Sequence, residues 1–359
     1  MKVKLGEYIQ EYSVRNKANE DIPVYSVTNT QGFCQDYFGK EVASKDKSTY
    51  KIVPRGYFAY NPSRINVGSV DWQRDEDQVI VSPLYNVFSV SPELNQQYLY
   101  YYLKSDFALH RIKAVATGSV RDNLKLKMLK NFPIRIPRVE EQEYIVQVLD
   151  KAKNIINLRR NELQKLDDLI KARFVEMFGD PAGKMNNYPK KRFDELCENL
   201  DSKRKPITAS VRESGNYPYY GASGIVDYVA DYIFDENILL VSEDGANLLM
   251  RSTPIAFSVS GKVWVNNHAH VVRFKNIYMQ KYIEVYFSMI DISDQITGSA
   301  QPKLNQAKLN ALEFALPEDA LLLEYYDFVA QIDKSKATVQ KALDETQLLF
   351  DSLMQQYFG

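Results

Sequence analysis

The chain of 359 residues repeats itself at an offset of 180 positions. A Thr-Gly-Ser triplet at 117–119 recurs at 297–299, and Leu124 has its counterpart in Leu304. A Phe-Gly pair at 178–179 likewise recurs at 358–359. A repeat of this kind indicates two copies of one structural unit, and a chain of this length exceeds the usual size of a single domain. The fold must therefore provide two equivalent modules.

Each repeat ends in a segment that predicts one long helix. Residues 140–178 contain no glycine or proline, and Pro137 and Gly179-Asp180-Pro181 bound this run. Apolar residues recur every three or four positions in this segment and in its copy, which is the pattern of a heptad seam. We expect the two seams to pack on each other as an antiparallel pair, through Ile145, Leu149, Ile156, Leu163, Leu166 and Ile170 of the first helix and Val329, Ile332, Val339, Leu343, Phe350 and Leu353 of the second.

The remainder of each repeat is predicted to combine strands and helices. Short runs of β-branched and aromatic residues, separated by Gly and Pro, precede a helix with an aromatic face at 93–103 and at 277–287. The expected fold class is α+β. Two similar modules, each a twisted sheet with helices, are separated by two long antiparallel coiled-coil helices, with a pseudo-two-fold internal repeat. The predicted boundaries are 1–138 and 182–317 for the modules, and 139–181 and 318–359 for the helical segments.

Composition excludes several classes of protein. Cys34 and Cys197 are far apart and have no metal-binding spacing, which favours reduced thiols and a cytoplasmic protein. No segment approaches the roughly 20 apolar residues that a membrane-spanning helix needs, so no membrane partner is expected.

No motif predicts a catalytic or metal site. Tyr60-Asn61-Pro62-Ser63 lacks the second proline and the aromatic residue of an amino-methyltransferase box, and no Gly-rich nucleotide loop follows a strand. His268 and His270 alternate along a strand with no third ligand in view, so we expect no metal. The acidic pair in Glu243-Asp244-Gly245 is interpreted as a solvated turn.

The distribution of charge along the chain indicates a polyanionic binding partner instead. The overall balance is -1, but residues 1–138 hold 20 lysines and arginines against 14 acidic residues, a balance of +6. Six of these cations gather between Arg111 and Lys130, which suits a phosphate-facing surface and equally suits a solvated helix face. The matching part of the second repeat carries amides and lysines that could reach base edges.

The sequence resembles the specificity (S) subunits of type I restriction-modification systems. The most specific segments are YPYYGASG at 217–224, EDGAN at 243–247, GKVWVNNHAH at 261–270 and TGSAQPKL at 297–304. The connecting helix also resembles the family through EEQ at 140–142 and MFGDP at 177–181, whereas the first module matches only through PRG at 54–56 and its TGS turn.

This resemblance implies two target-recognition domains, each of which reads half of a bipartite, asymmetric site in double-stranded DNA. The helices would dock two methyltransferase (M) subunits, and restriction (R) subunits would complete the complex. It implies that this chain is not an enzyme and binds no cofactor, with S-adenosylmethionine held by M and ATP and magnesium by R. The predicted DNA-binding residues are Arg64, Ser119, Arg121, Lys125, Lys127, Tyr220, Ser223, Asn247, Asn267, Gln301, Lys303 and Asn305. The alternatives are a self-contained DNA methyltransferase or nuclease, and a coiled-coil adaptor that does not bind DNA.

Overall fold

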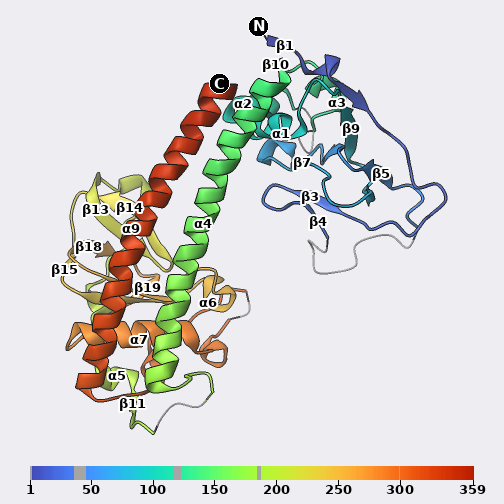
Figure 1. The fold of residues 1–359 in the computed structure, drawn as a ribbon. Helices are drawn as coiled ribbons and strands as arrows, with labels where there is room; N and C mark the ends of the chain where they lie inside the picture. Colours follow the sequence, from blue (N-terminus) through green and yellow to red (C-terminus); the bar gives the residue numbers. More distant parts are fainter. Residues whose placement is uncertain (1, 36–45, 117–122, 184–186, 299) are drawn as a thin grey trace. The chain divides into compact units, whose positions relative to one another are not determined.

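The computed structural model describes residues 2–35, 46–116, 123–183, 187–298 and 300–359 (Figure 1). The chain divides into two compact units, which are described separately. Unit 1 comprises Met1–Arg160 with Lys341–Gly359, and unit 2 comprises Asn161–Gln340. The unit boundaries therefore fall inside the two long helices, α4 (Val139–Phe178) and α9 (Asp319–Phe358). Both helices are confirmed at the lengths that the sequence predicts.

Unit 1 is built on a four-stranded antiparallel sheet in the order β2-β9-β6-β7. Within the described part of this unit, three two-stranded sheets accompany it: β1-β10, β3-β4 and β5-β8. The strands are β1 (Lys2–Lys4), β2 (Ile9–Glu11), β3 (Ser26–Thr28), β4 (Gly32–Cys34), β5 (Lys51–Pro54), β6 (Phe58–Tyr60), β7 (Val70–Trp72), β8 (Gln78–Val81), β9 (Asn86–Val90) and β10 (Pro133–Arg135). The shorter helices are η1 (Leu5–Glu7), η2 (Ile65–Val67), α1 (Gln96–Lys104), α2 (Asp106–Val115) and α3 (Leu126–Leu129).

Unit 2 repeats this sheet with the order β12-β19-β16-β17. A second four-stranded sheet, β14-β13-β18-β15, has no counterpart of that size among the described residues of unit 1. The strands are β11 (Lys190–Arg192), β12 (Cys197–Asn199), β13 (Ser214–Gly221), β14 (Gly224–Val229), β15 (Phe234–Asp235), β16 (Ile238–Ser242), β17 (Ala256–Val259), β18 (Lys262–Val265), β19 (Ala269–Phe274) and β20 (Glu313–Ala315). The helices are α5 (Phe193–Leu196), η3 (Asp201–Lys203), η4 (Ala209–Val211), α6 (Asn247–Met250), α7 (Ile277–Met289), η5 (Ser293–Gln295) and α8 (Gln306–Asn310). The α+β fold with two repeated modules is therefore confirmed.

The aromatic helices α1 and α7 hold equivalent positions in the two cores. The Tyr98 hydroxyl donates to the Arg135 carbonyl at 2.8 Å, and the Tyr282 hydroxyl donates to the Ala315 carbonyl at 2.6 Å. Both acceptors lie on the strand before a long helix and are 180 positions apart. Burial raises the pKa of Tyr98 to about 12, so this phenol keeps its proton at neutral pH.

Within unit 2 the two long helices run antiparallel. The Tyr325 hydroxyl donates to the Ile170 carbonyl at 3.0 Å, Arg173 pairs with Glu324 at 2.9 Å, and Lys336 pairs with Asp167. Across these three contacts the residue number on α4 increases while that on α9 decreases, which defines an antiparallel pair. None of the apolar residues predicted to pair is exposed in either unit.

The predicted seam misses two of the most buried residues of α4. Phe174 and Phe178 are fully buried, and the Phe174 ring stacks on Tyr282 with centroids 5.0 Å apart. A strict heptad places Arg173 and Met177 at these points. An α-helix drifts by about 20° per heptad, so the buried face near its end turns toward the sheet and α7. Among the described residues, no helix combines the length and apolar character that crossing a membrane requires.

Candidate nucleic-acid interface

In unit 1 the turn after β6, residues 61–64, is hydrogen-bonded to Asn123 and Leu124, which lie within the basic stretch 111–130. The Leu124 backbone N–H donates to the Pro62 carbonyl at 3.1 Å, and the Tyr60 hydroxyl donates to the Leu124 carbonyl at 3.0 Å. The Ser63 hydroxyl adds a 2.7 Å hydrogen bond to the Asn123 side chain. The fold thus joins this turn to the segment that begins at Asn123 and continues into α3.

Unit 2 has the same arrangement after β16, in the turn 243–246. The Leu304 backbone N–H donates to the Glu243 carbonyl at 2.8 Å, and the Gly245 N–H donates to the Pro302 carbonyl at 3.0 Å. Leu124 and Leu304 correspond in the repeat, and β6 and β16 occupy the same place in their sheets. We call this pairing of turn and leucine segment the clamp. It is common to both units.

The two clamps use different side chains to hold the leucine carbonyl. Tyr60 does so in unit 1, and burial raises its pKa, so the phenol stays neutral. In unit 2 the acceptor is the Leu304 carbonyl, which lies 2.8 Å from Nε2 of His270. The His270 side chain is 1% exposed, and its Nδ1 lies 2.6 Å from Asp201.

The His270 ring lies between a carbonyl and a carboxylate. A carbonyl oxygen can only accept, so Nε2 must carry a hydrogen. Burial alone would raise the pKa of Asp201, but hydrogen bonds from His270 and from the Val271 N–H outweigh burial and lower it. The Asp201 carboxylate is therefore ionised at neutral pH, and it lies 2.6 Å from Nδ1 of His270. Through its two ring nitrogens His270 joins η3, β19 and the Leu304 segment.

The acidic turn of unit 2 is neutralised by neighbouring cations. Glu243, with a side chain 12% exposed, pairs with Arg204 at 2.5 Å and with Lys303 at 3.0 Å. Asp244 pairs with His268 at 2.9 Å. Burial would raise the pKa of Glu243, but the hydrogen bonds from Arg204 and Lys303 lower it. The expectation of a solvated turn is therefore wrong, because the fold brings Arg204, Lys303 and His268 to it.

The same cluster corrects the reasoning about metal ligands. The sequence showed no third ligand beside the histidines, yet ligand atoms of Asp201, Glu243 and His270 lie within 4.8 Å of one another. Arg204 lies 3.3 Å from Asp201, and His270 Nε2 faces a carbonyl. The carboxylates thus already have cationic partners, and the arrangement fits an ion-pair network better than a cation site. The absence of a metal stays a prediction.

Comparison with known proteins gives the family. The model of the type I restriction modification DNA specificity domain matches residues 2–168 and again residues 185–346. The chain belongs to this family. A Haemophilus influenzae protein described as a type I restriction enzyme specificity subunit is 36% identical over 127 residues, which are 35% of this chain. The match spans 32% of that relative's own length.

Two solved structures show the same fold. The S subunit of a type I restriction-modification system from M. genitalium covers the whole chain and 96% of its own, with a TM-score of 0.56 at 15% identity. A chain from a structure on complex assembly and conformational transition of the type I R-M system covers the whole chain and 97% of its own, with a TM-score of 0.54 at 15% identity. The two family-domain matches correspond to the two copies of the clamp.

The predicted DNA-binding residues fall into four groups. Ser119 and Arg121 lie outside the described residues. The exposed group is Arg64, Lys125, Lys127, Ser223, Asn267, Gln301 and Lys303, of which Lys303 is held by Glu243. Tyr220 is half-buried with its ring near Phe257.

Two predicted residues have their side chains occupied by local structure. Asn305 accepts from the Lys308 N–H at 3.0 Å and caps α8. Asn247 accepts from the Thr253 N–H and donates to the Thr253 carbonyl, both at 3.0 Å. Because their side chains are occupied in this way, these two amides are not part of the proposed interface. Conversely, sequence reasoning missed Asp201 and Arg204, since no local motif joins them to residues some 40 to 70 positions away.

Lys104 links two loops near Arg64 in unit 1. Its ammonium donates to the Asn29 carbonyl at 3.2 Å and to the Gly68 carbonyl. Burial lowers its pKa to about 8, with Asp71 raising it and Lys153 lowering it further. The residue is therefore close to losing its charge at mildly alkaline pH.

This shift predicts a pH dependence of unit 1. The unfolded chain binds more protons than the folded chain between about pH 8 and the ordinary lysine value of 10.5, so the free energy of unfolding rises with pH across that window. We expect the melting temperature of the native sequence to rise relative to that of Lys104→Met as pH increases from 7 to 10. The measurement follows Trp72 fluorescence in a Trp264→Phe background. A difference that stays constant with pH would contradict the prediction.

Proposed function

We propose that the chain is the non-catalytic DNA-specificity subunit of a type I restriction-modification complex, and that each unit reads one half of a bipartite site. The observation that carries this proposal is the clamp, which both units share while presenting different side chains. Unit 1 presents Asn61 and Arg64 on its turn, whereas unit 2 presents Glu243 and Asp244 with their basic partners. One scaffold with two different reading surfaces suits an asymmetric site, because a homodimer would impose a palindrome.

A module exchange tests this division of labour. Replacing residues 1–137 with the corresponding module of a relative should change the bases of one half-site and leave the other unchanged. The readout is the sequence around methylated adenines when the chain is assembled with its methyltransferase partners. A change in both half-sites would overturn independent reading.

The remaining partners follow from the family resemblance. Two methyltransferase subunits would dock on the helices, and restriction subunits would complete the complex. S-adenosylmethionine would be held by the former, and ATP and magnesium by the latter. We expect the purified chain alone to transfer no methyl group to DNA, and a transfer by the isolated chain would refute the non-catalytic role.

Lys125 and Lys127 are expected to contact DNA phosphates. Both are exposed directly after the unit 1 clamp, where a cation can face the backbone. Changing either residue to Ala should weaken binding to all duplexes alike and reduce the salt slope of the binding constant by about one. Lys151→Ala, an exposed lysine on α4, serves as the control. Unchanged affinity and salt slope in both variants would remove this segment from the interface.

A further inference from the structure

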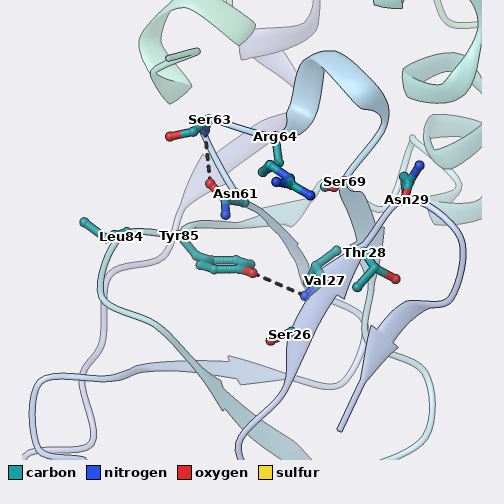
Figure 2. A pocket seen from close by; sticks show the side chains of 10 residues that line it. All are labelled: Ser26, Val27, Thr28, Asn29, Asn61, Ser63, Arg64, Ser69, Leu84 and Tyr85. Atoms are coloured by element: carbon teal, nitrogen blue, oxygen red, sulfur yellow. Dashed lines mark hydrogen bonds between the residues drawn. The ribbon is translucent and has the colours of Figure 1, made fainter. Parts of the chain in front are cut away.

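A hollow of about 560 Å³ lies beside the unit 1 clamp (Figure 2). The turn 61–64, the end of β3, the Asn29 loop and the Leu84-Tyr85 turn form its walls. Its described lining offers hydroxyl groups, side-chain amides and one guanidinium, and it contains no carboxylate. A negatively polarised ligand would therefore meet no repulsive charge on these walls.

Arg64 is the cation of this hollow. Its backbone N–H donates to the Asn61 carbonyl at 3.0 Å, while the Asn61 side chain accepts from the Ser63 N–H at 3.0 Å. These bonds fix the turn, so the direction of Arg64 is set by β6 and by the clamp. Among the described residues, no acidic side chain pairs with the guanidinium, which is exposed and lies inside the hollow in Figure 2.

The lining distinguishes base edges from phosphate as the ligand. A phosphate needs only donors and positive charge, and exposed Lys125 and Lys127 offer these close by. The hollow instead mixes donors with acceptors, from the exposed Asn29 and the half-buried Ser26 and Asn61, and adds the exposed apolar side chain of Leu84. Donors, acceptors and an apolar group together are what base edges require, including the thymine methyl group.

We propose that this hollow reads base edges in the half-site bound by unit 1, and that Arg64 determines a guanine there. A guanidinium pairs with O6 and N7 of guanine through two hydrogen bonds in the major groove. The clamp ties the Arg64 turn to the segment that carries Lys125 and Lys127, so phosphate contacts set the register in which Arg64 meets its base. This inference rests on the proposed function.

The test selects bound duplexes from a randomised library, using the full chain assembled with its methyltransferase partners. With the native sequence we expect a guanine to be specified at one position of one half-site. Arg64→Ala should reduce that preference roughly 10-fold to 100-fold and leave every other position unchanged. Arg64→Gln should lose the same preference, and Lys125→Ala should weaken binding without altering any preference.

The outcomes separate the inference from the proposed function. If Arg64→Ala and Arg64→Gln weaken binding to all sequences alike, Arg64 contacts phosphate and the inference is overturned. The same holds if either variant, folded as judged by Trp72 fluorescence, keeps the full guanine preference. If the native complex selects no sequence at all, the proposed function itself fails.

Discussion

Asp201→Asn is expected to destabilise unit 2 by about 3 kcal/mol at neutral pH. The Asp201 side chain is 9% exposed, and it accepts from His270 and lies 3.3 Å from Arg204. An amide would leave the Arg204 guanidinium and the buried His270 ring facing a neutral group, and loss of one partner of a buried pair is far more costly than loss of a surface pair. The His270 ring, which bonds the Leu304 carbonyl, would lose its own support as well.

The two tryptophans allow each unit to be followed separately. Trp72 lies in unit 1 and Trp264 in unit 2, so a Trp72→Phe background leaves Trp264 as the only tryptophan. Denaturant unfolding followed by Trp264 fluorescence gives the free energy of unfolding of unit 2. Asp294→Asn is the matched control, because Asp294 is exposed in η5. Equal unfolding free energies for the two variants would rule out the buried network as a source of stability.

The pH dependence gives this prediction a second check. The folded-state pKa of Asp201 lies below the ordinary value of 3.8, so its contribution to stability is complete above that value. The contribution is lost as pH falls through the lowered pKa. The difference between the native sequence and Asp201→Asn should therefore be constant near neutrality and shrink below about pH 4.

Lengthening both long helices by one heptad is expected to add roughly three base pairs between the half-sites. Seven residues extend an α-helix by about 10 Å, and duplex DNA rises about 3.4 Å per base pair. Duplicating residues 159–165 in α4 and 331–337 in α9 keeps both apolar stripes in phase. The bases of each half-site should stay the same, because no reading residue moves within its own unit.

The structure decides where the second insertion belongs. The repeat alone would place it after Glu345, which is 180 positions from Lys165. The ion pair between Asp167 and Lys336 instead puts the point opposite Lys165 near Ala337. The measurement is the spacing of methylated sites for the assembled complex, with a single-helix insertion as the control that breaks register. An active complex with the original spacing would leave the helices as docking surfaces only.

The sequence by itself determined the repeat, both long helices and the aromatic faces of the helices at 93–103 and 277–287. These features depend on periodicity and on residues at a fixed offset, which act through local backbone preferences and a continuous apolar face. Short runs of β-branched and aromatic residues are the same kind of pattern, and β16 and β19 are two of the strands that such runs form.

Only the tertiary structure decided which polar side chains meet. Asp201 reaches His270 across 69 positions, and Ser63 reaches Asn123 across 60, through tertiary contacts that no local pattern encodes. Contacts with Arg204 and Lys303 likewise turn Glu243 from a solvated acid into a paired one. The sequence does not distinguish a polar side chain that is free from one that is hydrogen-bonded, because its role depends on the partners that folding brings within hydrogen-bonding distance.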